Sequence, residues 1–293
     1  MRTRWAAIRT RPAQSPSVST RASIDALPAG ELPGRRTPPA GTARSERMSW
    51  TMRLLGLACA LVAGAAAAQD YDREARWRAE VVPGLVVGEA VDLRASSGRS
   101  FLGVYTPANE AKTALVIVHG IGVHPDHGII GRLRMELADR GFSTLSIQMP
   151  VLAAEAEASQ YAKTFPEAAQ RIAAAADWLQ AKGYRALSLV SHSLGSRMAN
   201  TYFDAHERPA FRTWVTLGLS GDFTSAFAKR RPVPVLDVFG ERDLAAVVDA
   251  APRRARLLGT IDGARQLRIA GADHFYAGRE AELVDAIDAY LRR

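Results

Sequence analysis

One serine has the surroundings expected of an activated nucleophile. Ser193 lies in the sequence Ser-His-Ser-Leu-Gly, between the apolar run 186–190 and a segment whose apolar residues recur at helical spacing. Small residues two positions before and after such a serine, here Ser191 and Gly195, let a strand and a helix approach closely while the turn exposes the hydroxyl. A serine that only caps a helix shares this short motif. The prediction that Ser193 attacks a carbonyl carbon therefore depends on the strand before it and the helix after it.

A serine nucleophile needs a base to remove its proton and a carboxylate to orient that base. His274 follows the predicted strand 266–269, and Asp243 follows the predicted strand 233–239. The carboxyl ends of parallel strands lie at one edge of a sheet, so both side chains are expected to face the serine. Asp222 also follows a predicted strand. We expect Asp243 to be the acid, and the sequence leaves Asp222 open as the alternative.

Two backbone N–H groups are needed to stabilise the negative charge that develops on the carbonyl oxygen of a substrate. We expect one from Leu194, directly after the nucleophile, and one from Ile121, in a Gly-Ile-Gly turn that follows the apolar run 114–118. His192 is expected to support the nucleophile turn and not to act as a second base. Four residues in or just after the Gly-Ile-Gly turn are predicted to contact substrate: Gly120, Gly122, His124 and His127.

The same turn carries a group of side chains that resembles a metal site. His119, His124, Asp126 and His127 lie within nine residues of one another. No later carboxylate pattern accompanies them, and His119 fits the end of the strand that leads into the turn. We therefore expect no metal, and the proposed chemistry needs no cofactor.

Short apolar runs alternate with helical patterns from residue 85 to the end of the chain. This rhythm predicts an α/β fold with a mostly parallel twisted sheet of about eight strands and helices on both faces. The runs 86–93 and 101–105 flank a Ser-Ser-Gly turn and predict an antiparallel hairpin. Only about fifteen residues separate the predicted strands 211–217 and 233–239. No large lid domain is expected there.

The positive charge of the chain lies almost wholly outside the predicted domain. The chain of 293 residues has a formal net charge of +8, of which residues 1–68 carry +7 and residues 69–293 carry +1. A nearly neutral domain does not have the basic surface that nucleic acid binding requires. We expect no nucleic acid partner.

The N-terminal region has the layout of an exported protein. Residues 1–47 are rich in Arg, Ser, Pro and Ala and predict a disordered extension, which lies upstream of the true start if translation begins at Met48 or Met52. An organelle transit peptide has a similar composition and is the alternative. Residues 48–68 combine a basic start, an apolar run and terminal alanines, which is typical of a cleaved signal peptide. We expect a linker at 69–84, a catalytic domain at 85–293, a periplasmic or secreted location and no stable membrane anchor after cleavage.

The single cysteine, Cys59, lies in the predicted signal peptide. Cleavage would leave a chain without cysteine, which excludes disulfides, thiolate metal ligands and a cysteine nucleophile. The domain is therefore expected to depend on packing for its stability.

Taken together, the segments His119-Gly120, 191–195, Gly240 to Asp243 and Gly271 to His274 resemble the α/β-hydrolase superfamily over about residues 85–293. The stretch 124–150 resembles, more narrowly, a poorly characterised exported bacterial branch of it. The superfamily resemblance implies Ser193 as nucleophile, Asp243 as acid and His274 as base, in the chain order associated with these hydrolases.

These features predict a serine hydrolase that cleaves a carboxylic ester, or a similar bond, of a small molecule through an acyl-enzyme. Hydrolysis of an amide or thioester by the same residues is an alternative, because a fold does not determine a substrate. A catalytically silent binding protein of the cell envelope is a third possibility. The sequence leaves the acyl chain length and the oligomeric state open.

Overall fold

The computed structural model describes residues 69–293. The predicted extension and signal peptide lie outside the described residues, and the expectations on them and on localisation stay predictions. Within the described part, every helix is too short or too polar to cross a membrane.

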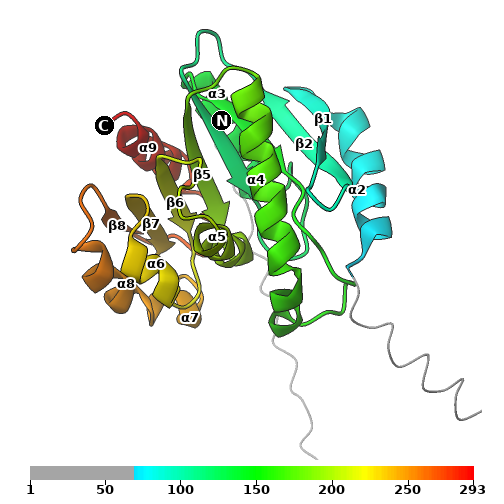
Figure 1. Ribbon diagram of the computed structural model, residues 1–293. Coiled ribbons are helices and arrows are strands. Elements are labelled where there is room, and N and C mark those ends of the chain that lie inside the picture. Colours follow the sequence, from blue (N-terminus) through cyan, green and yellow to red (C-terminus); the bar gives the residue numbers. More distant parts are fainter. Residues whose placement is uncertain (1–68) are drawn as a thin grey trace, which may run out of the picture. The chain divides into compact units, whose positions relative to one another are not determined.

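An eight-stranded sheet forms the centre of the domain (Figure 1). Its strand order is β1-β2-β4-β3-β5-β6-β7-β8, and every neighbouring pair from β4 to β8 is parallel, whereas β2 pairs antiparallel with both β1 and β4. The predicted fold class, strand number and hairpin are thus confirmed. The strands are β1 (Glu89–Arg94), β2 (Ser100–Thr106), β3 (Thr113–Val118), β4 (Ser143–Ile147), β5 (Ala186–His192), β6 (Thr213–Leu217), β7 (Val235–Gly240) and β8 (Arg265–Ile269).

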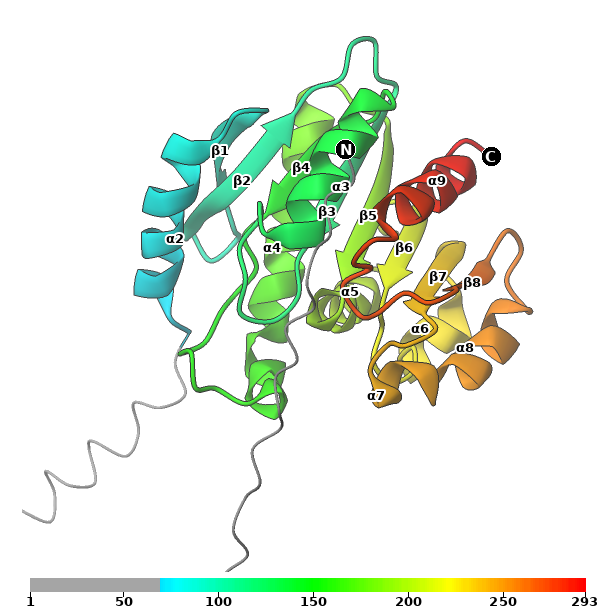
Figure 2. The same ribbon diagram turned by 180° about the vertical axis from the view of Figure 1, so that it is seen from behind.

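Helices cover both faces of the sheet, which makes the central strands apolar on both sides. In β3, Leu115 and Ile117 pack with helices α3 (Gly128–Asp139) and α9 (Glu280–Leu291), while Val116 and Val118 pack with α4 (Phe165–Ala181) and α5 (Leu194–Ala205). Figure 1 looks onto α4 and α5, and Figure 2, from behind, onto α3 and α9. The smaller helices are η2 (Ala158–Thr164), α6 (Ser225–Arg230), α7 (Ala245–Val248) and α8 (Ala251–Leu258).

The connection between β6 and β7 holds only the six-residue helix α6. The expectation of no large lid domain is therefore confirmed for the described residues. Short loops follow the carboxyl ends of the parallel strands. The loops after β3, β5, β7 and β8 carry the residues that the sequence predicts to form the site.

The segment 69–84, which the sequence predicts to be a linker, forms helix α2 (Tyr71–Gly84) instead. The Asp70 carboxylate caps this helix by accepting the Arg73 N–H. Val81 packs against Leu102 and Val104 of β2, so α2 covers the outer part of the sheet at the β1–β2 edge. The helix lacks a broad apolar stripe, and many of its contacts are polar, which explains why apolar periodicity does not predict it.

Candidate active site

Ser193 stands at a sharp junction between β5 and α5. Its φ of 56° and ψ of −123° are unusual for a residue with a side chain, and such strain costs on the order of 1–3 kcal/mol. The Ser193 N–H donates to the carbonyl of Leu217 at 2.8 Å, which ties the turn to β6. A Cβ added at Gly195 would collide with the His119 carbonyl, so the close approach of α5 requires glycine there. The local sequence therefore holds the Ser193 hydroxyl outward in a half-buried position.

Ser191 stands where glycine is usual in this motif, and the structure accommodates it. The Trp214 indole N–H donates to the Ser191 hydroxyl at 2.8 Å, and Ser196 Oγ lies 3.0 Å from the same hydroxyl. The side chain is completely buried but fully engaged in hydrogen bonds. This departure leaves the turn intact.

The three side chains named by the sequence form one hydrogen-bonded row. His274 Nε2 lies 2.8 Å from Ser193 Oγ, and His274 Nδ1 lies 2.6 Å from Asp243 Oδ1. Asp222 instead pairs with Arg253 on the surface, at 2.9 Å. The structure thus brings Asp243, and not Asp222, to the imidazole.

The Asp243 carboxylate is held in its charged form although it is buried. Burial alone raises the pKa of Asp243, but the hydrogen bond and charge of His274 and the N–H groups of Leu244 and Gly240 outweigh this, so the pKa lies below its ordinary value. A charged carboxylate at this place fixes the imidazole with its proton on Nδ1. His274 Nε2 is then free to accept the proton of the Ser193 hydroxyl.

The two backbone segments expected to supply the oxyanion donors both lie beside Ser193. Leu194 is the first residue of α5, so its N–H has no acceptor within the helix. Ile121 follows Gly120, where an added Cβ would come within 3.0 Å of the Ser193 Cβ. Both predicted donors therefore belong to backbone segments next to the nucleophile.

An apolar pocket of about 740 Å³ opens beside the Ser193 hydroxyl. Leu244 and Phe275 stand at its side with 54% and 62% of their surfaces exposed. The pocket has room for a small or medium-sized organic group next to the reacting atoms. Its lining consists of Gly120, Ile121, Val123, His127, Gly128, Ile129, Ile130, Arg132, His192, Ser193, Leu244, His274, Phe275, Ala277 and Glu280.

Solved structures with the same arrangement of strands and helices come from several bacteria and one environmental library. A serine hydrolase without a lid from Xanthomonas campestris superposes with a TM-score of 0.56 at 15% identity, covering 71% of this chain and 95% of its own. A dienelactone hydrolase from Anabaena variabilis gives 0.56 at 17% identity, with coverages of 70% and 96%. A cold-adapted esterase from an Arctic intertidal metagenomic library gives 0.52 at 17%, with coverages of 69% and 92%. The chain has the α/β-hydrolase fold.

Sequence comparison does not assign an activity to this chain. Residues 54–170 match a family model described as a protein of unknown function, DUF3530. No curated protein matches the chain.

Two of the four residues predicted to contact substrate line the pocket. Gly120 and His127 line it, whereas Gly122 and His124 do not. The Gly122 carbonyl accepts a hydrogen bond from Arg73 at 3.4 Å, and His124 packs edge-on against Trp77, both on α2. Gly122 and His124 therefore lie outside this pocket, because helix α2, which the sequence did not predict, packs on that side of the turn.

No metal site is formed by this group of histidines in the described chain. Within residues 69–293, no three His, Cys, Asp or Glu side chains come together in a way that could hold a metal ion. Asp126 pairs with Arg134 at 2.6 Å, and His119 is completely buried at the end of β3. Asp126 and His119 therefore each have a partner within the fold, Arg134 for the carboxylate and the Met149 N–H for the imidazole.

Several pocket residues were not predicted from the sequence. Leu244 and Phe275 directly follow Asp243 and His274, so their adjacency to the predicted triad was a usable signal. Ile129 and Ile130 come from the start of α3, and their spacing reads equally well as core. The sequence contains no signal that distinguishes Ile129 and Ile130 as pocket-lining residues from ordinary core residues.

His192 holds the loop that carries His274. Its Nε2–H donates to the His274 carbonyl at 2.9 Å, and burial lowers the pKa of His192 to about 4. Burial likewise lowers the pKa of His119 to about 3. Both imidazoles are therefore neutral at pH 7, and for His119 the hydrogen bond that its Nε2 accepts from the Met149 N–H also requires this.

The lowered pKa values of His192 and His119 predict that the protein loses stability in mild acid. An unfolded histidine binds a proton below about pH 6.5, whereas His192 in the fold does so only near pH 4, so the free energy of unfolding falls as the pH drops through that window. His192 alone contributes a loss on the order of 3 kcal/mol by pH 4. Urea unfolding of wild type and His192→Gln at pH 7, 5.5 and 4.5 measures this loss. The free energy of unfolding of the variant should depend less steeply on pH than that of the wild type. Equal slopes for the two proteins would contradict this assignment.

Proposed function

We propose that this chain is a serine hydrolase that cleaves a carboxylic ester of a small molecule through an acyl-enzyme on Ser193. One observation carries the proposal: Ser193 Oγ, the His274 imidazole and the Asp243 carboxylate form a continuous hydrogen-bonded row beside an apolar pocket. The fold supports this chemistry in general terms, because it places all three residues after the carboxyl ends of sheet strands. No cofactor is part of the proposal.

The first half of the reaction forms the acyl-enzyme. His274 Nε2 takes the proton of the Ser193 hydroxyl while Oγ attacks the carbonyl carbon of the ester. The carbonyl oxygen becomes an oxyanion, which accepts hydrogen bonds from the N–H groups of Leu194 and Ile121. When the intermediate collapses, the bond from carbon to the alcohol oxygen breaks, and His274 gives its proton to the departing alcohol.

Water completes the cycle by the same steps. His274 removes a proton from a water molecule that attacks the acyl carbon, and the proton then returns to Ser193 Oγ as the acid leaves. Asp243 stabilises the positive charge that the His274 imidazole carries in both halves. The enzyme is regenerated with no net change in its protonation.

The apolar pocket supports a preference for esters with a short to medium aliphatic group. Each methylene buried against side chains such as Ile129 and Phe275 contributes up to about 0.8 kcal/mol, or about fourfold in kcat/KM. We therefore expect kcat/KM to rise from nitrophenyl acetate to butyrate and hexanoate. A series that falls steadily from acetate onward would contradict this use of the pocket.

A fluorophosphonate probe tests the proposed nucleophile directly, because it reacts covalently with an activated serine. We expect labelling of the wild type and no labelling of Ser193→Ala. A folded wild type that neither reacts with the probe nor cleaves short nitrophenyl esters would refute the hydrolase proposal and favour a binding protein. Labelling without ester cleavage would move the proposal to amide or thioester substrates.

A further inference from the structure

Helix α2 contacts the turn that presents the Ile121 N–H. We call residues 119–122 the oxyanion turn. We propose that α2 is a positioning element for this turn, with Arg73 and Glu74 as its positioning residues. The inference rests on the proposed function, since the turn matters to catalysis only if an oxyanion forms beside Ser193.

The first connection is direct and comes from Arg73. Its guanidinium donates to the Leu152 carbonyl at 2.9 Å and to the Gly122 carbonyl at 3.4 Å. The same guanidinium lies 4.6 Å from the ring centre of Trp77, which in turn packs edge-on against His124. Arg73 therefore joins the far end of the oxyanion turn to the segment that follows β4.

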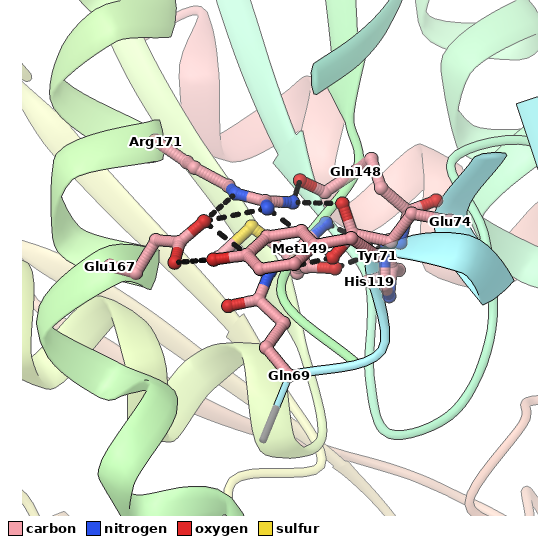
Figure 3. A network of polar contacts seen from close by, with 8 residues as sticks. All are labelled: Gln69, Tyr71, Glu74, His119, Gln148, Met149, Glu167 and Arg171. Atoms are coloured by element: carbon pink, nitrogen blue, oxygen red, sulfur yellow. Dashed lines mark hydrogen bonds and ion pairs between the residues drawn. The ribbon is translucent and has the colours of Figure 1, made fainter. Parts of the chain in front are cut away.

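The second connection runs from Glu74 through a buried arginine (Figure 3). The Arg171 side chain of α4 is fully buried, and it pairs with Glu74 at 2.9 Å and with Glu167 at 2.7 Å. One of its N–H groups also donates to the Gln148 carbonyl at 2.9 Å. Glu74, with only 9% of its side chain exposed, is thus one of two carboxylates that hold this cation in place.

The backbone after β4 passes the constraint on to the oxyanion turn. Met149, the residue after Gln148, donates its N–H to His119 Nε2 at 2.9 Å. Since Nε2 accepts, the proton of the neutral ring is on Nδ1, which donates to the Gly120 carbonyl at 2.8 Å. The chain of contacts from Glu74 therefore ends on the Gly120 carbonyl.

Peptide geometry makes that last contact decisive for the oxyanion. The Gly120 carbonyl and the Ile121 N–H belong to one peptide unit, which is planar and trans, so they point in opposite directions. When His119 holds the Gly120 carbonyl, it also fixes the direction of the Ile121 N–H. Arg73 contacts the Gly122 carbonyl two peptide units further along, so the turn is restrained on both sides of the peptide that carries the donor.

Two substitutions in α2 test the proposal against one matched control. Glu74→Gln removes the charge that holds Arg171, and Arg73→Met keeps the apolar stem but removes both carbonyl contacts. Arg78→Met is the control, because Arg78 is an arginine of the same helix whose ion pair with Asp92 of β1 does not involve the turn. Each protein is measured for kcat and KM on nitrophenyl butyrate and for thermal midpoint.

The decisive readout is inhibition by a trifluoromethyl ketone, which forms a tetrahedral adduct whose oxyanion needs the same two donors. We expect Glu74→Gln and Arg73→Met to lower kcat roughly 10-fold, to leave KM within about twofold and to raise the inhibition constant in proportion to the loss in kcat. Arg78→Met should change neither kcat nor the inhibition constant. A purely structural role of α2 would move the thermal midpoints and leave kcat and the inhibition constant of the folded variants unchanged.

The outcomes separate this inference from the proposed function. If the wild type reacts with the fluorophosphonate and Ser193→Ala does not, the hydrolase proposal stands. If both α2 variants then have the same kcat and the same inhibition constant as the wild type, only the positioning role is overturned. If the wild type has no activity, both proposals fall together. Should Glu74→Gln not fold, Arg73→Met alone tests the positioning role. Arg73 is only partly buried, and its removal leaves no buried charge without a partner.

Discussion

Replacing Ser193 with alanine is expected to lower kcat for a short nitrophenyl ester by about 10⁶-fold, to the level left by binding and the oxyanion donors alone. The side chain supplies the atom that forms the acyl bond, and its hydroxyl is the group within 2.8 Å of His274 Nε2. Steady-state hydrolysis, with intact-mass detection of the acylated wild type, measures both the loss and the missing intermediate.

Ser196→Ala provides the control for this experiment. Ser196 is a buried serine in the first turn of α5, three residues after Ser193, and its hydroxyl donates to the Ser191 carbonyl at 3.0 Å rather than facing the pocket. Its removal is expected to cost some stability and to change kcat by less than about tenfold. Comparable losses in the two variants would mean that the whole turn had collapsed and would remove the support for Ser193 as nucleophile.

The sheet was predictable because its central strands carry strong local signals. Strand β3 is a continuous run of apolar residues from Ala114 to Val118, all of which are fully buried, and a short run rich in β-branched residues is typical of a strand covered on both faces. Helix α2 had no such signal. It is held by contacts such as that between Glu74 and Arg171, which lie 97 positions apart, and no local pattern reports a pairing over that distance.

The reacting residues were predictable for a related reason. Ser193, Asp243 and His274 each follow a strand, so the fold itself brings them to one edge of the sheet. The direction in which a loop side chain points is a different matter. His124 and His127 are three positions apart, yet only His127 lines the pocket, because Trp77 of α2 packs against His124. That outcome depends on an element remote in sequence.

Asp243→Asn is expected to lower kcat by about 10⁴-fold while leaving KM nearly unchanged. Asp243 Oδ1 accepts hydrogen bonds from His274 Nδ1 and the Leu244 N–H, and Oδ2 accepts one from the Gly240 N–H. An amide NH₂ group in either position would face a donor, and the charge that stabilises the imidazolium would be lost in both orientations. Single-turnover and steady-state kinetics at pH 7 to 9 measure the effect.

Asp222→Asn is the matched control, because Asp222 is the other aspartate that follows a strand at this edge. It pairs with Arg253 and is about half exposed, so neutralising it should change kcat by less than twofold and stability by well under about 1 kcal/mol. The two aspartates stand in similar sequence settings, and only the contact with His274 separates them. If Asp222→Asn proved the more damaging change, the loop after β7 would have to rearrange in solution, and the row of side chains beside the pocket would not be the working arrangement.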